Sequence, residues 1–581
     1  MVFDIFAIVG GASGGGKSTP GGNAVLQRKY IGERPRLVKH ACGIASGVLA
    51  VAFASTALAS TAFAASAFAA CEDLVKLPVK AGKITSAVTV LKDSKVVLPL
   101  RSLIAPADFC RVAVTLTPTD DSVILAEVWL PDPKKWNGNF LGAGGGGFGG
   151  SVSAPAGDMG SELAKGYATA GDDLGHEISS PTDVDTSWAI GHPEKIKDFA
   201  YRADHVTAEF AKALIAAYYG RAPQFSYFRG CSNGGHEALM EAQRYPEDYD
   251  GIVAGAPANA WTHLMANFLW NERALFDAPQ SEIPKAKLAV IQSAVLAKCD
   301  ALDGVKDGVI NDPAMCRFDP AVLACKAGDA PDCLTHPQLE ALRKIYEGPV
   351  NPGTGEKIYP GFPPGYEGLT NNWDFWILGL RAQSLMANHF FGSFVWGDPK
   401  WDYHTFDFAK DVHRTDVELG AIVNSDSPDL SAFAARGGKL IIFQGWADAA
   451  VTPWGTIQYF ESVRKNMGAE PARRFARLFM APGMMHCGGG PGPNNFDAVA
   501  SVAAWREKNQ APETIIAARY APSTTPGAPS GEPVSTRPLC AYPKVAHWTG
   551  HGSPDEAKNY LCRAGAGAPH LDASAPHGAT P

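Results

Sequence analysis

The sequence has no excess of positive charge and no basic stripe. Its 51 Lys and Arg residues are outnumbered by 59 Asp and Glu residues, which gives a formal net charge of -8. Nucleic-acid-binding proteins usually carry a basic patch, so this balance argues against DNA or RNA as a partner. The chain also lacks any C-x-x-C pair and any internal repeat. Its cysteines are spaced like disulfide bridges rather than metal sites.

Strongly apolar runs are scarce as well, which bears on the amino-terminal segment. Residues 34–40 are basic, residues 41–64 are weakly apolar and rich in Ala, and residues 67–69 (Ala-Phe-Ala) fit a cleavage signal. We therefore predict that residues 1–70 are a leader with an export signal that is removed, which gives a secreted or periplasmic protein without a membrane anchor. A retained membrane helix is disfavoured by the weak apolarity. A lipoprotein acylated at Cys71 is disfavoured because Phe68 is a poor match to the usual Leu.

The leader contains a P-loop pattern at residues 11–18, Gly-Ala-Ser-Gly-Gly-Gly-Lys-Ser, which taken literally predicts ATP binding. That mechanism needs a helix that begins at the lysine and holds phosphate at its amino terminus. The Pro-Gly-Gly sequence at residues 20–22 would break such a helix. We interpret the match as a coincidence and expect no organic cofactor.

The chain is long enough to bury a large core, with 581 residues of which 46% are hydrophobic. Residues 71–256 alternate predicted strands (122–130, 167–171 and 252–255) with a predicted helix at 199–219. This pattern indicates an α/β fold with a doubly wound, mostly parallel sheet. The alternation stops at residues 257–429, which predicts a large inserted lid domain. Residues 430–565 are predicted to complete the core, with the sheet resuming at Gly438 and ending near Cys562. Residues 566–581 are predicted to be a disordered tail.

The pentapeptide at residues 230–234, Gly-Cys-Ser-Asn-Gly, fits the G-x-S-x-G pattern of the nucleophile elbow in α/β hydrolases. An apolar run at residues 225–228 precedes it and a helix-like stretch at residues 237–244 follows it. Ser232 would therefore lie on a sharp turn between a strand and a helix. Small neighbours are needed there because the turn is strained and backbones pass close together. An ordinary turn serine is the alternative that the pentapeptide alone leaves open.

Two further residues are candidates for a catalytic triad. Asp448 follows the apolar run 439–443 and His486 follows the run 475–480, so both come just after the carboxyl ends of predicted strands, where open α/β sheets place their sites. The order Ser, Asp, His is that of α/β hydrolases. Asp426 and Asp429 also precede His486, but they lie in a Ser/Pro/Asp loop with a short apolar lead-in. Asp448 is therefore favoured to orient His486, which would accept the proton of Ser232.

Taken together, these motifs resemble the tannase and feruloyl esterase family. The resemblance rests on Gly-Cys-Ser-x-Gly-Gly at residues 230–235, on the later Asp, on His-Cys-x-Gly-Gly-Pro-Gly at residues 486–492 and on the acidic stretch 299–309. It runs from about Cys71 to Cys562. It implies an α/β-hydrolase fold with a lid and a serine esterase that acts on small aromatic esters. Gallate, ferulate and related hydroxycinnamate esters are typical, and some relatives act on terephthalate half-esters.

Two other functions remain as alternatives. A catalytically inactive protein that binds polyphenols or carbohydrates could keep the same fold, but the intact triad argues against it. A peptidase would share the triad, but nothing in the sequence supports an extended peptide cleft. The sequence does not indicate an oligomeric state.

Removal of the leader takes away Cys42 and leaves ten cysteines, an even number. The resemblance implies three disulfides: Cys231–Cys487, Cys299–Cys316 and Cys325–Cys333. Proximity and elimination then pair the remaining cysteines as Cys71–Cys110 and Cys540–Cys562. If Cys231 and Cys487 are bonded, the bond places His486 beside Ser232.

A tetrahedral intermediate of ester hydrolysis needs two N–H donors. One should be the amide of Asn233, directly after the nucleophile. The other is predicted from the glycine-rich run at residues 142–147, with Gly147 as first choice and Gly146 as reserve. A flexible linker is the alternative, but a linker would not follow so directly on the apolar residues 140–141.

Asp300, Asp303 and Asp307 put three carboxylates on one tight loop, and oxygen ligands suit Ca²⁺. The spacing differs from that of an EF-hand, and on its own the loop would be a solvated acidic turn. The resemblance to the family's lid implies a structural calcium site, completed by the carbonyl groups of Val305 and Val309.

Substrate contacts are only weakly indicated. Phe375, Trp376 and Phe391 in the lid segment could grip an aromatic acid, and Arg381 could meet a charged group of the substrate. For each aromatic side chain, packing within the lid is the alternative.

Overall fold

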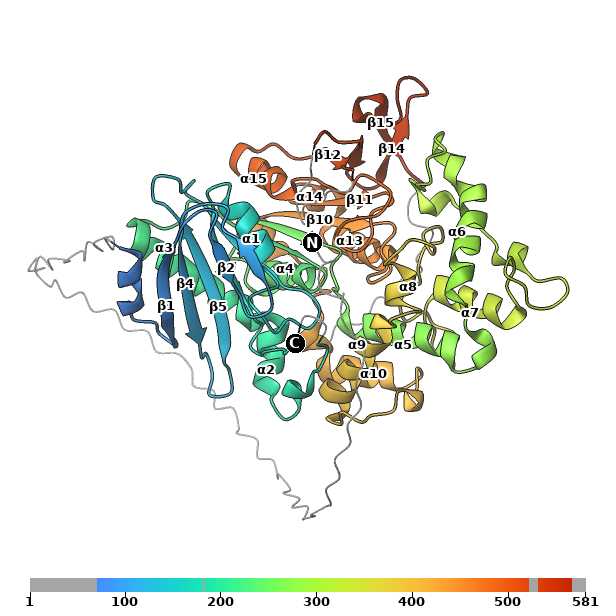
Figure 1. The fold of residues 1–581 in the computed structure, drawn as a ribbon, viewed down its shortest axis with the longest axis horizontal. Helices are drawn as coiled ribbons and strands as arrows, with labels where there is room; N and C mark the ends of the chain where they lie inside the picture. The colour runs from blue at the N-terminus through green and yellow to red at the C-terminus, as the bar shows by residue number, and fades with distance from the viewer. Residues whose placement is uncertain (1–69, 181–182, 522–530, 567–581) are drawn as a thin grey trace, which may run out of the picture. The chain divides into compact units, whose positions relative to one another are not determined.

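The computed structural model describes residues 70–180, 183–521 and 531–566 (Figure 1). The predicted leader up to residue 69, with its P-loop pattern and Cys42, and the predicted tail from residue 567 lie outside these residues. Among the helices that are described, none combines the length and the apolar character needed to cross a lipid bilayer.

A nine-stranded mixed sheet forms the centre of the described chain. In sheet order its strands are β1 (Gly82–Val90), β4 (Phe109–Leu116), β5 (Ile124–Pro131), β7 (Ala168–Asp172), β6 (Phe140–Ala143), β8 (Ser226–Cys231), β9 (Gly251–Gly255), β10 (Lys439–Gly445) and β11 (Ala476–Ala481). Neighbouring strands from β7 to β11 run parallel, whereas β1, β4, β5 and β7 pair antiparallel. The predicted mostly parallel α/β sheet is therefore confirmed.

Helices cover both faces of this sheet. They are α1 (Ala156–Leu163), α2 (Pro193–Lys197), α3 (Ala203–Tyr219), α4 (Asn233–Arg244), α12 (Ser431–Ala435), α13 (Pro453–Met467), α14 (Ala469–Arg473) and α15 (Ala498–Lys508). Successive side chains of a strand point to opposite faces. Accordingly, Phe228 of β8 shares one core with Leu239 of α4, while Tyr227 shares the other core with Trp505 of α15. Strands buried on both faces are apolar throughout, which is why the sequence reveals them.

The segment between β9 and β10, which contains the predicted lid at residues 257–429, has none of the named strands. Apart from α12, its α-helices are α5 (Trp261–Phe276), α6 (Lys285–Cys299), α7 (His336–Glu347), α8 (Trp373–Trp376), α9 (Ala382–Phe390), α10 (Asp411–Thr415) and α11 (Ala421–Val423). In Figure 1 these helices form the green to orange group. Their contacts make them part of one compact unit with the sheet.

The prediction that the large sheet continues to about Cys562 is wrong, because its last strand, β11, ends at Ala481. The later strands form separate antiparallel pairs, although an isolated bridge joins Phe479 of β11 to Ala541. The small sheets are β2 (Lys95–Val97) with β3 (Ser102–Ile104), β12 (Thr514–Arg519) with β13 (Ser535–Cys540), and β14 (Lys544–Trp548) with β15 (Tyr560–Ala564). A disulfide between β13 and β15 joins the last two pairs.

The described residues form five disulfides, and these are the five pairs expected from the family resemblance and from proximity and elimination. They join Cys71 to Cys110, Cys231 to Cys487, Cys299 to Cys316, Cys325 to Cys333, and Cys540 to Cys562. Disulfides in this number persist in oxidising surroundings. They indicate an extracytoplasmic protein.

Candidate active site

Ser232 lies on the sharp turn between β8 and α4, as its sequence motif predicts. Its backbone angles, φ 67° and ψ -120°, are strained for a residue with a side chain. The neighbouring glycines allow the backbone to pass this closely. A Cβ atom on Gly230 would lie 2.2 Å from the carbonyl oxygen of Gly234, and one on Gly235 would lie 2.2 Å from that of Gly255.

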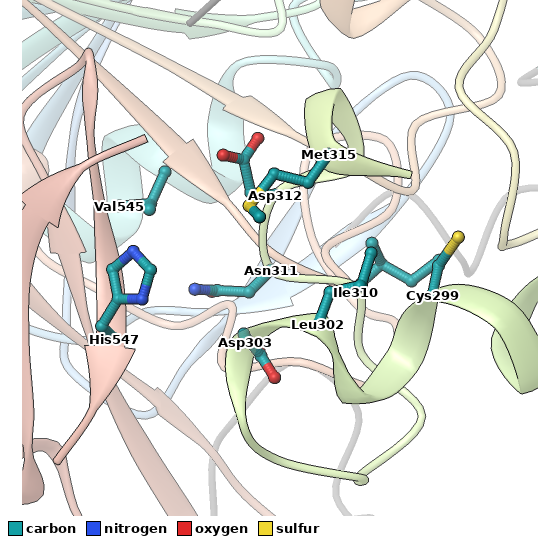
Figure 2. Close-up of a pocket in the computed structure, with 9 residues that line it drawn as sticks. All are labelled: Cys299, Leu302, Asp303, Ile310, Asn311, Asp312, Met315, Val545 and His547. Atoms are coloured by element: carbon teal, nitrogen blue, oxygen red, sulfur yellow. The ribbon is translucent and has the colours of Figure 1, made fainter. Parts of the chain in front are cut away.

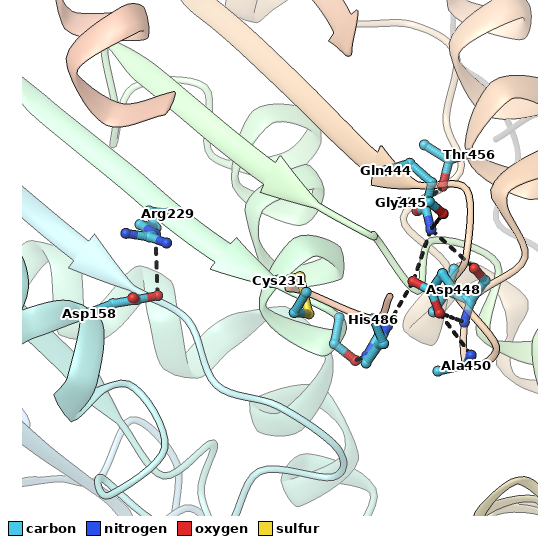
Figure 3. Close-up of a disulfide and its surroundings, with 12 residues drawn as sticks. Asp158, Arg229, Cys231, Gln444, Gly445, Asp448, Ala450, Thr456 and His486 are labelled. Atoms are coloured by element: carbon cyan, nitrogen blue, oxygen red, sulfur yellow. Dashed lines mark hydrogen bonds and ion pairs between the residues drawn. A yellow bond between two sulfur atoms is a disulfide. The ribbon is translucent and has the colours of Figure 1, made fainter. Parts of the chain in front are cut away.

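The structure brings Ser232, His486 and Asp448 together, and Figure 3 shows His486 beside Asp448. The Oγ atom of Ser232 lies 2.8 Å from Nε2 of His486, and Nδ1 of His486 lies 2.8 Å from Oδ2 of Asp448. The carboxylate can only accept a hydrogen bond, so Nδ1 carries the proton and Nε2 is left to accept the proton of the serine. Asp448 follows the end of β10 and His486 follows the end of β11, as the sequence predicts.

Asp448 is fixed by a set of donors that the sequence did not reveal. Its Oδ1 atom accepts the N–H groups of Ala450 and Val451 at 2.8 and 2.9 Å, and its Oδ2 atom accepts Nε2 of Gln444 at 2.9 Å. Thr456 in turn donates its hydroxyl to Oε1 of Gln444 at 2.9 Å. These bonds satisfy a carboxylate that is only 2% exposed and hold it in one orientation.

The two other aspartates that precede His486 have different partners. Asp429 accepts the N–H of Ser431 at 2.9 Å, just before α12. Burial raises the pKa of Asp426, and the charge of His263 partly offsets that effect. Neither carboxylate contacts His486 among the described hydrogen bonds, so the preference for Asp448 agrees with the geometry.

The disulfide between Cys231 and Cys487 joins the two loops of the site. Cys231 precedes Ser232 and Cys487 follows His486, and the two cysteines are 256 residues apart in the sequence. Figure 3 shows the bond directly beside His486. It therefore connects the serine turn covalently to the histidine loop.

Gly147, Ser232 and Asn233 line the same pocket, whereas Gly146 is not among its lining residues. Gly147 has φ 61°, a left-handed conformation that favours glycine. Within the part of the chain that is described, its N–H donates no hydrogen bond. The first choice for the second oxyanion donor thus lies at the pocket, and the reserve does not.

The rest of this pocket is apolar. Its other lining residues are Ala258, Trp261, Leu264, Met265, Phe268, Trp376, Met386, Ala450 and Val451. None of these described lining residues carries a charge. Four of them, at positions 261, 264, 265 and 268, form one face of α5, because residues i, i+3, i+4 and i+7 of a helix lie together. That periodicity was the signal available in the sequence, and it was missed.

Of the three aromatic residues predicted to contact substrate, one lines the pocket and two do not. Trp376 lines the pocket, and its ring centroid lies 5.3 Å from that of His486. Phe375 packs edge-on against Trp376 and is not among the lining residues. Phe391 is fully buried against Trp401 and Phe406. It is not among the residues that line the pocket, so its contact with substrate stays a prediction that the described pocket does not support.

The guanidinium of Arg381 is already paired and is not among the groups that line the pocket. It forms an ion pair with Glu272, a carboxylate of α5 that is 2% exposed, and it lies over the ring of Phe276. The buried carboxylate requires this partner. The prediction that Arg381 meets a charged group of the substrate is therefore not supported by its contacts.

Comparison with known proteins decides the family. The family model described as tannase and feruloyl esterase matches residues 110–563. The chain belongs to the tannase and feruloyl esterase family. As a member of this family it is a carboxylic ester hydrolase.

Individual relatives agree with this assignment. An uncharacterized esterase of Xanthomonas campestris pv. campestris is 41% identical over 87% of this chain and 93% of its own length. A mono(2-hydroxyethyl) terephthalate hydrolase of Piscinibacter sakaiensis is 34% identical over 74% of this chain and 80% of its own. The crystal structure of feruloyl esterase B from Aspergillus oryzae superposes with a TM-score of 0.76 at 26% identity, covering 85% of this chain and 99% of that one.

The acidic loop of this tannase-family chain follows α6. Asp300 accepts the N–H of Gly308 with both oxygens, at 3.0 and 3.1 Å, and Asp303 accepts that of Val305 at 2.9 Å. The carboxylate of Asp307 pairs with Arg537 at 2.6 Å. Figure 2 shows the small cavity between this loop and β14, which Asp303 helps to line.

The oxygen ligands of this loop suit a calcium ion, but their side chains do not lie close enough together to form a site. The second oxygen of Asp303 is buried without a partner, and burial raises the pKa of this carboxyl to about 6, with Asp307 and Asp300 adding to the effect. A bound cation would supply the missing partner. However, no three acidic, His or Cys side chains in the described chain gather closely enough to hold a metal ion. Calcium therefore stays a prediction.

Chelation tests that prediction. If calcium is bound at Asp300, Asp303 and Asp307, with the carbonyl groups of Val305 and Val309, EGTA should lower the melting temperature by several degrees. Activity at 25 °C should be unchanged. Differential scanning fluorimetry with and without EGTA, and after re-addition of CaCl₂, measures the effect. An identical melting curve in all three samples would rule out a structural calcium ion.

Proposed function

We propose that this protein is a serine esterase that hydrolyses esters of small aromatic acids through an acyl-enzyme on Ser232. The observation that carries the proposal is the hydrogen-bonded chain from Ser232 through His486 to Asp448, which opens on an apolar, aromatic-lined pocket. The residues of the chain would act as follows.

The Oγ atom of Ser232 attacks the ester carbonyl while Nε2 of His486 takes its proton, and Asp448 stabilises the imidazolium that results. The N–H groups of Gly147 and Asn233 donate hydrogen bonds to the carbonyl oxygen as its negative charge develops. His486 then gives its proton to the departing alcohol. A water molecule, activated by the same imidazole, releases the acid and restores Ser232.

The pocket supports an uncharged aromatic acyl group. Trp261, Phe268 and Trp376 offer flat apolar surface, and no described lining side chain carries the positive charge that would balance a carboxylate. Burying an unpaired charge is costly. A ferulate-type acyl group therefore suits this pocket better than the terephthalate half-ester named for the Piscinibacter relative. The predicted export signal and the disulfides support secretion or a periplasmic location.

A matched pair of substrates tests the proposal. Dimethyl terephthalate has two methyl esters, whereas monomethyl terephthalate has a free carboxylate in place of one of them. Ethyl ferulate serves as a second neutral ester. We expect kcat/KM to be at least about 10-fold higher for the neutral diester than for the anionic half-ester, because an unpaired polar group costs about 1–3 kcal/mol or more. Equal or faster hydrolysis of the half-ester would refute the uncharged pocket. Hydrolysis of none of the three would refute the aromatic esterase itself.

A further inference from the structure

The two halves of the oxyanion hole come from separate elements that must stay in register. One donor belongs to the loop after β6, which carries Gly147, and the other belongs to the first turn of α4, which begins at Asn233. A shift of about 1 Å between donors and substrate can cost about two orders of magnitude in rate. Some contact must therefore fix the loop to the helix.

The carboxyl group of Glu237 makes that contact from both sides. Its Oε2 atom accepts the N–H of Gly145 at 2.9 Å, and its Oε1 atom accepts Nδ2 of Asn233 at 2.9 Å. The N–H of Gly234 adds a bond of 3.2 Å to the carbonyl oxygen of Gly145. One side chain thus connects the loop to the residue that follows the nucleophile.

The fit around this carboxylate is close. Glu237 is 1% exposed, and a Cβ atom on Gly144 would lie 2.5 Å from its Oε2 atom. Only glycine at position 144 lets the loop approach so near. The side chain therefore fills the space between the loop and α4.

The surroundings of Glu237 disfavour its charged form. Burial raises its pKa to about 8, and the carboxyl of Asp172 adds to the increase. Asp204 of α3 and Glu241 of α4 also belong to this buried acidic group, and burial raises the pKa of each. Both oxygens of Glu241 lack hydrogen-bond partners within the described chain. Glu237 differs from this neighbour because it bonds the loop and the helix.

We propose that Glu237 is a positioning residue of the esterase site, which sets the distance between the Gly147 and Asn233 donors. This inference rests on the function proposed above. The oxyanion forms only as the reaction proceeds, so an interaction that aligns its donors raises kcat and leaves KM nearly unchanged. Glu237 itself does not touch the substrate.

The test compares Glu237→Ala and Glu237→Gln with Glu241→Ala as the matched control. Glu241 is an equally buried glutamate one turn further along α4. We expect Glu237→Ala to lower kcat for ethyl ferulate about 10- to 100-fold, somewhat less than the loss of an oxyanion donor. KM should change less than about 3-fold. Glu241→Ala should keep kcat within about 2-fold of the parent, since no described hydrogen bond of its side chain reaches the glycine-rich loop or Asn233.

Glu237→Gln should recover most of the activity. A Gln side chain can still accept the N–H of Gly145, and its amide can donate to Oδ1 of Asn233, a buried atom that lacks a partner in the described chain. That bond needs only a flip of the Asn233 amide. Recovery of activity by this neutral side chain would show that Glu237 acts by bridging the loop and the helix rather than through a charge.

An arylboronic acid gives an independent measurement, because its adduct with Ser232 places an oxygen between the same donors. Its inhibition constant should rise in Glu237→Ala by a factor similar to the fall in kcat. Asn233→Ala keeps the backbone donor but removes the other end of the bridge, so it should lower kcat in the same direction. This variant decides the matter even if Glu237→Ala does not fold.

Several results would overturn the proposal. They are an equal loss of kcat in Glu241→Ala, a rise in KM with kcat intact in Glu237→Ala, and full activity in Asn233→Ala. Ser232→Ala in the same assay separates the two proposals. If that variant were fully active, the serine esterase itself would be refuted; if it were inactive while Glu237→Ala kept its kcat, only the positioning role would be.

Discussion

Replacing Ser232 with Ala is expected to lower kcat for an aromatic ester by about 100,000-fold, since removing the nucleophile of a triad eliminates the covalent route. Substrate should still bind, because the apolar lining of the pocket does not change. Replacing the hydroxyl by hydrogen leaves His486 and Asp448 in contact. The loss is measured as the rate at which ethyl ferulate is hydrolysed, monitored through the ferulic acid that is released.

The control for this variant is Ser226→Ala, a buried serine at the start of the same strand β8, which should keep its activity. A fluorophosphonate should label the parent protein at Ser232 and leave Ser232→Ala unlabelled. Both proteins should have the same melting temperature within about 2 °C, because a substitution that creates no large cavity changes stability little. Activity in Ser232→Ala, or an adduct elsewhere in the parent, would contradict the assignment of the nucleophile.

The sequence was sufficient for the sheet wherever a strand is buried on both faces. β8, β9, β10 and β11 are short apolar runs bounded by turn residues, and such runs are typical of buried parallel strands. β12 to β15 mislead because a strand of a small hairpin and a strand at the edge of a large sheet can have the same pattern. Which partner a strand pairs with depends on distant residues, here including the disulfide between Cys540 and Cys562.

The three triad residues were predictable because their order along the chain and the apolar runs that precede them can be read directly from the sequence. The pocket was not, since an aromatic residue in a helical segment can face either a cavity or the core. Trp376 and Phe391 look alike in the sequence, yet one lines the pocket and the other is enclosed. Arg381 shows the same limit for charge, because its partner Glu272 lies 109 residues away. Gln444 and Thr456 support Asp448 only through contacts that the fold creates.

Removing the Cys231–Cys487 bond should affect both stability and chemistry. In the chain-entropy model a bond that closes a loop of 256 residues stabilises the folded state by up to about 5 kcal/mol. The bond also holds the backbone of His486 next to that of Ser232. We expect Cys231→Ser with Cys487→Ser to lower the free energy of unfolding by several kcal/mol and kcat by about 100-fold, since a misplaced base loses its alignment with the nucleophile. Guanidinium unfolding and ester hydrolysis at a temperature where the variant is folded measure the two effects.

The double variant Cys325→Ser with Cys333→Ser is the matched control, because it removes a disulfide far from the triad in the sequence. Its cysteines are only 8 residues apart, so the same model gives a loss of about 2.5 kcal/mol, roughly half as much. Its kcat should equal that of the parent, since none of the described triad contacts involves these cysteines. If both variants lost stability but neither lost kcat, the bond beside His486 would serve only to stabilise the fold. If only the Cys231–Cys487 variant lost kcat, the bond would be part of what aligns the base with its serine.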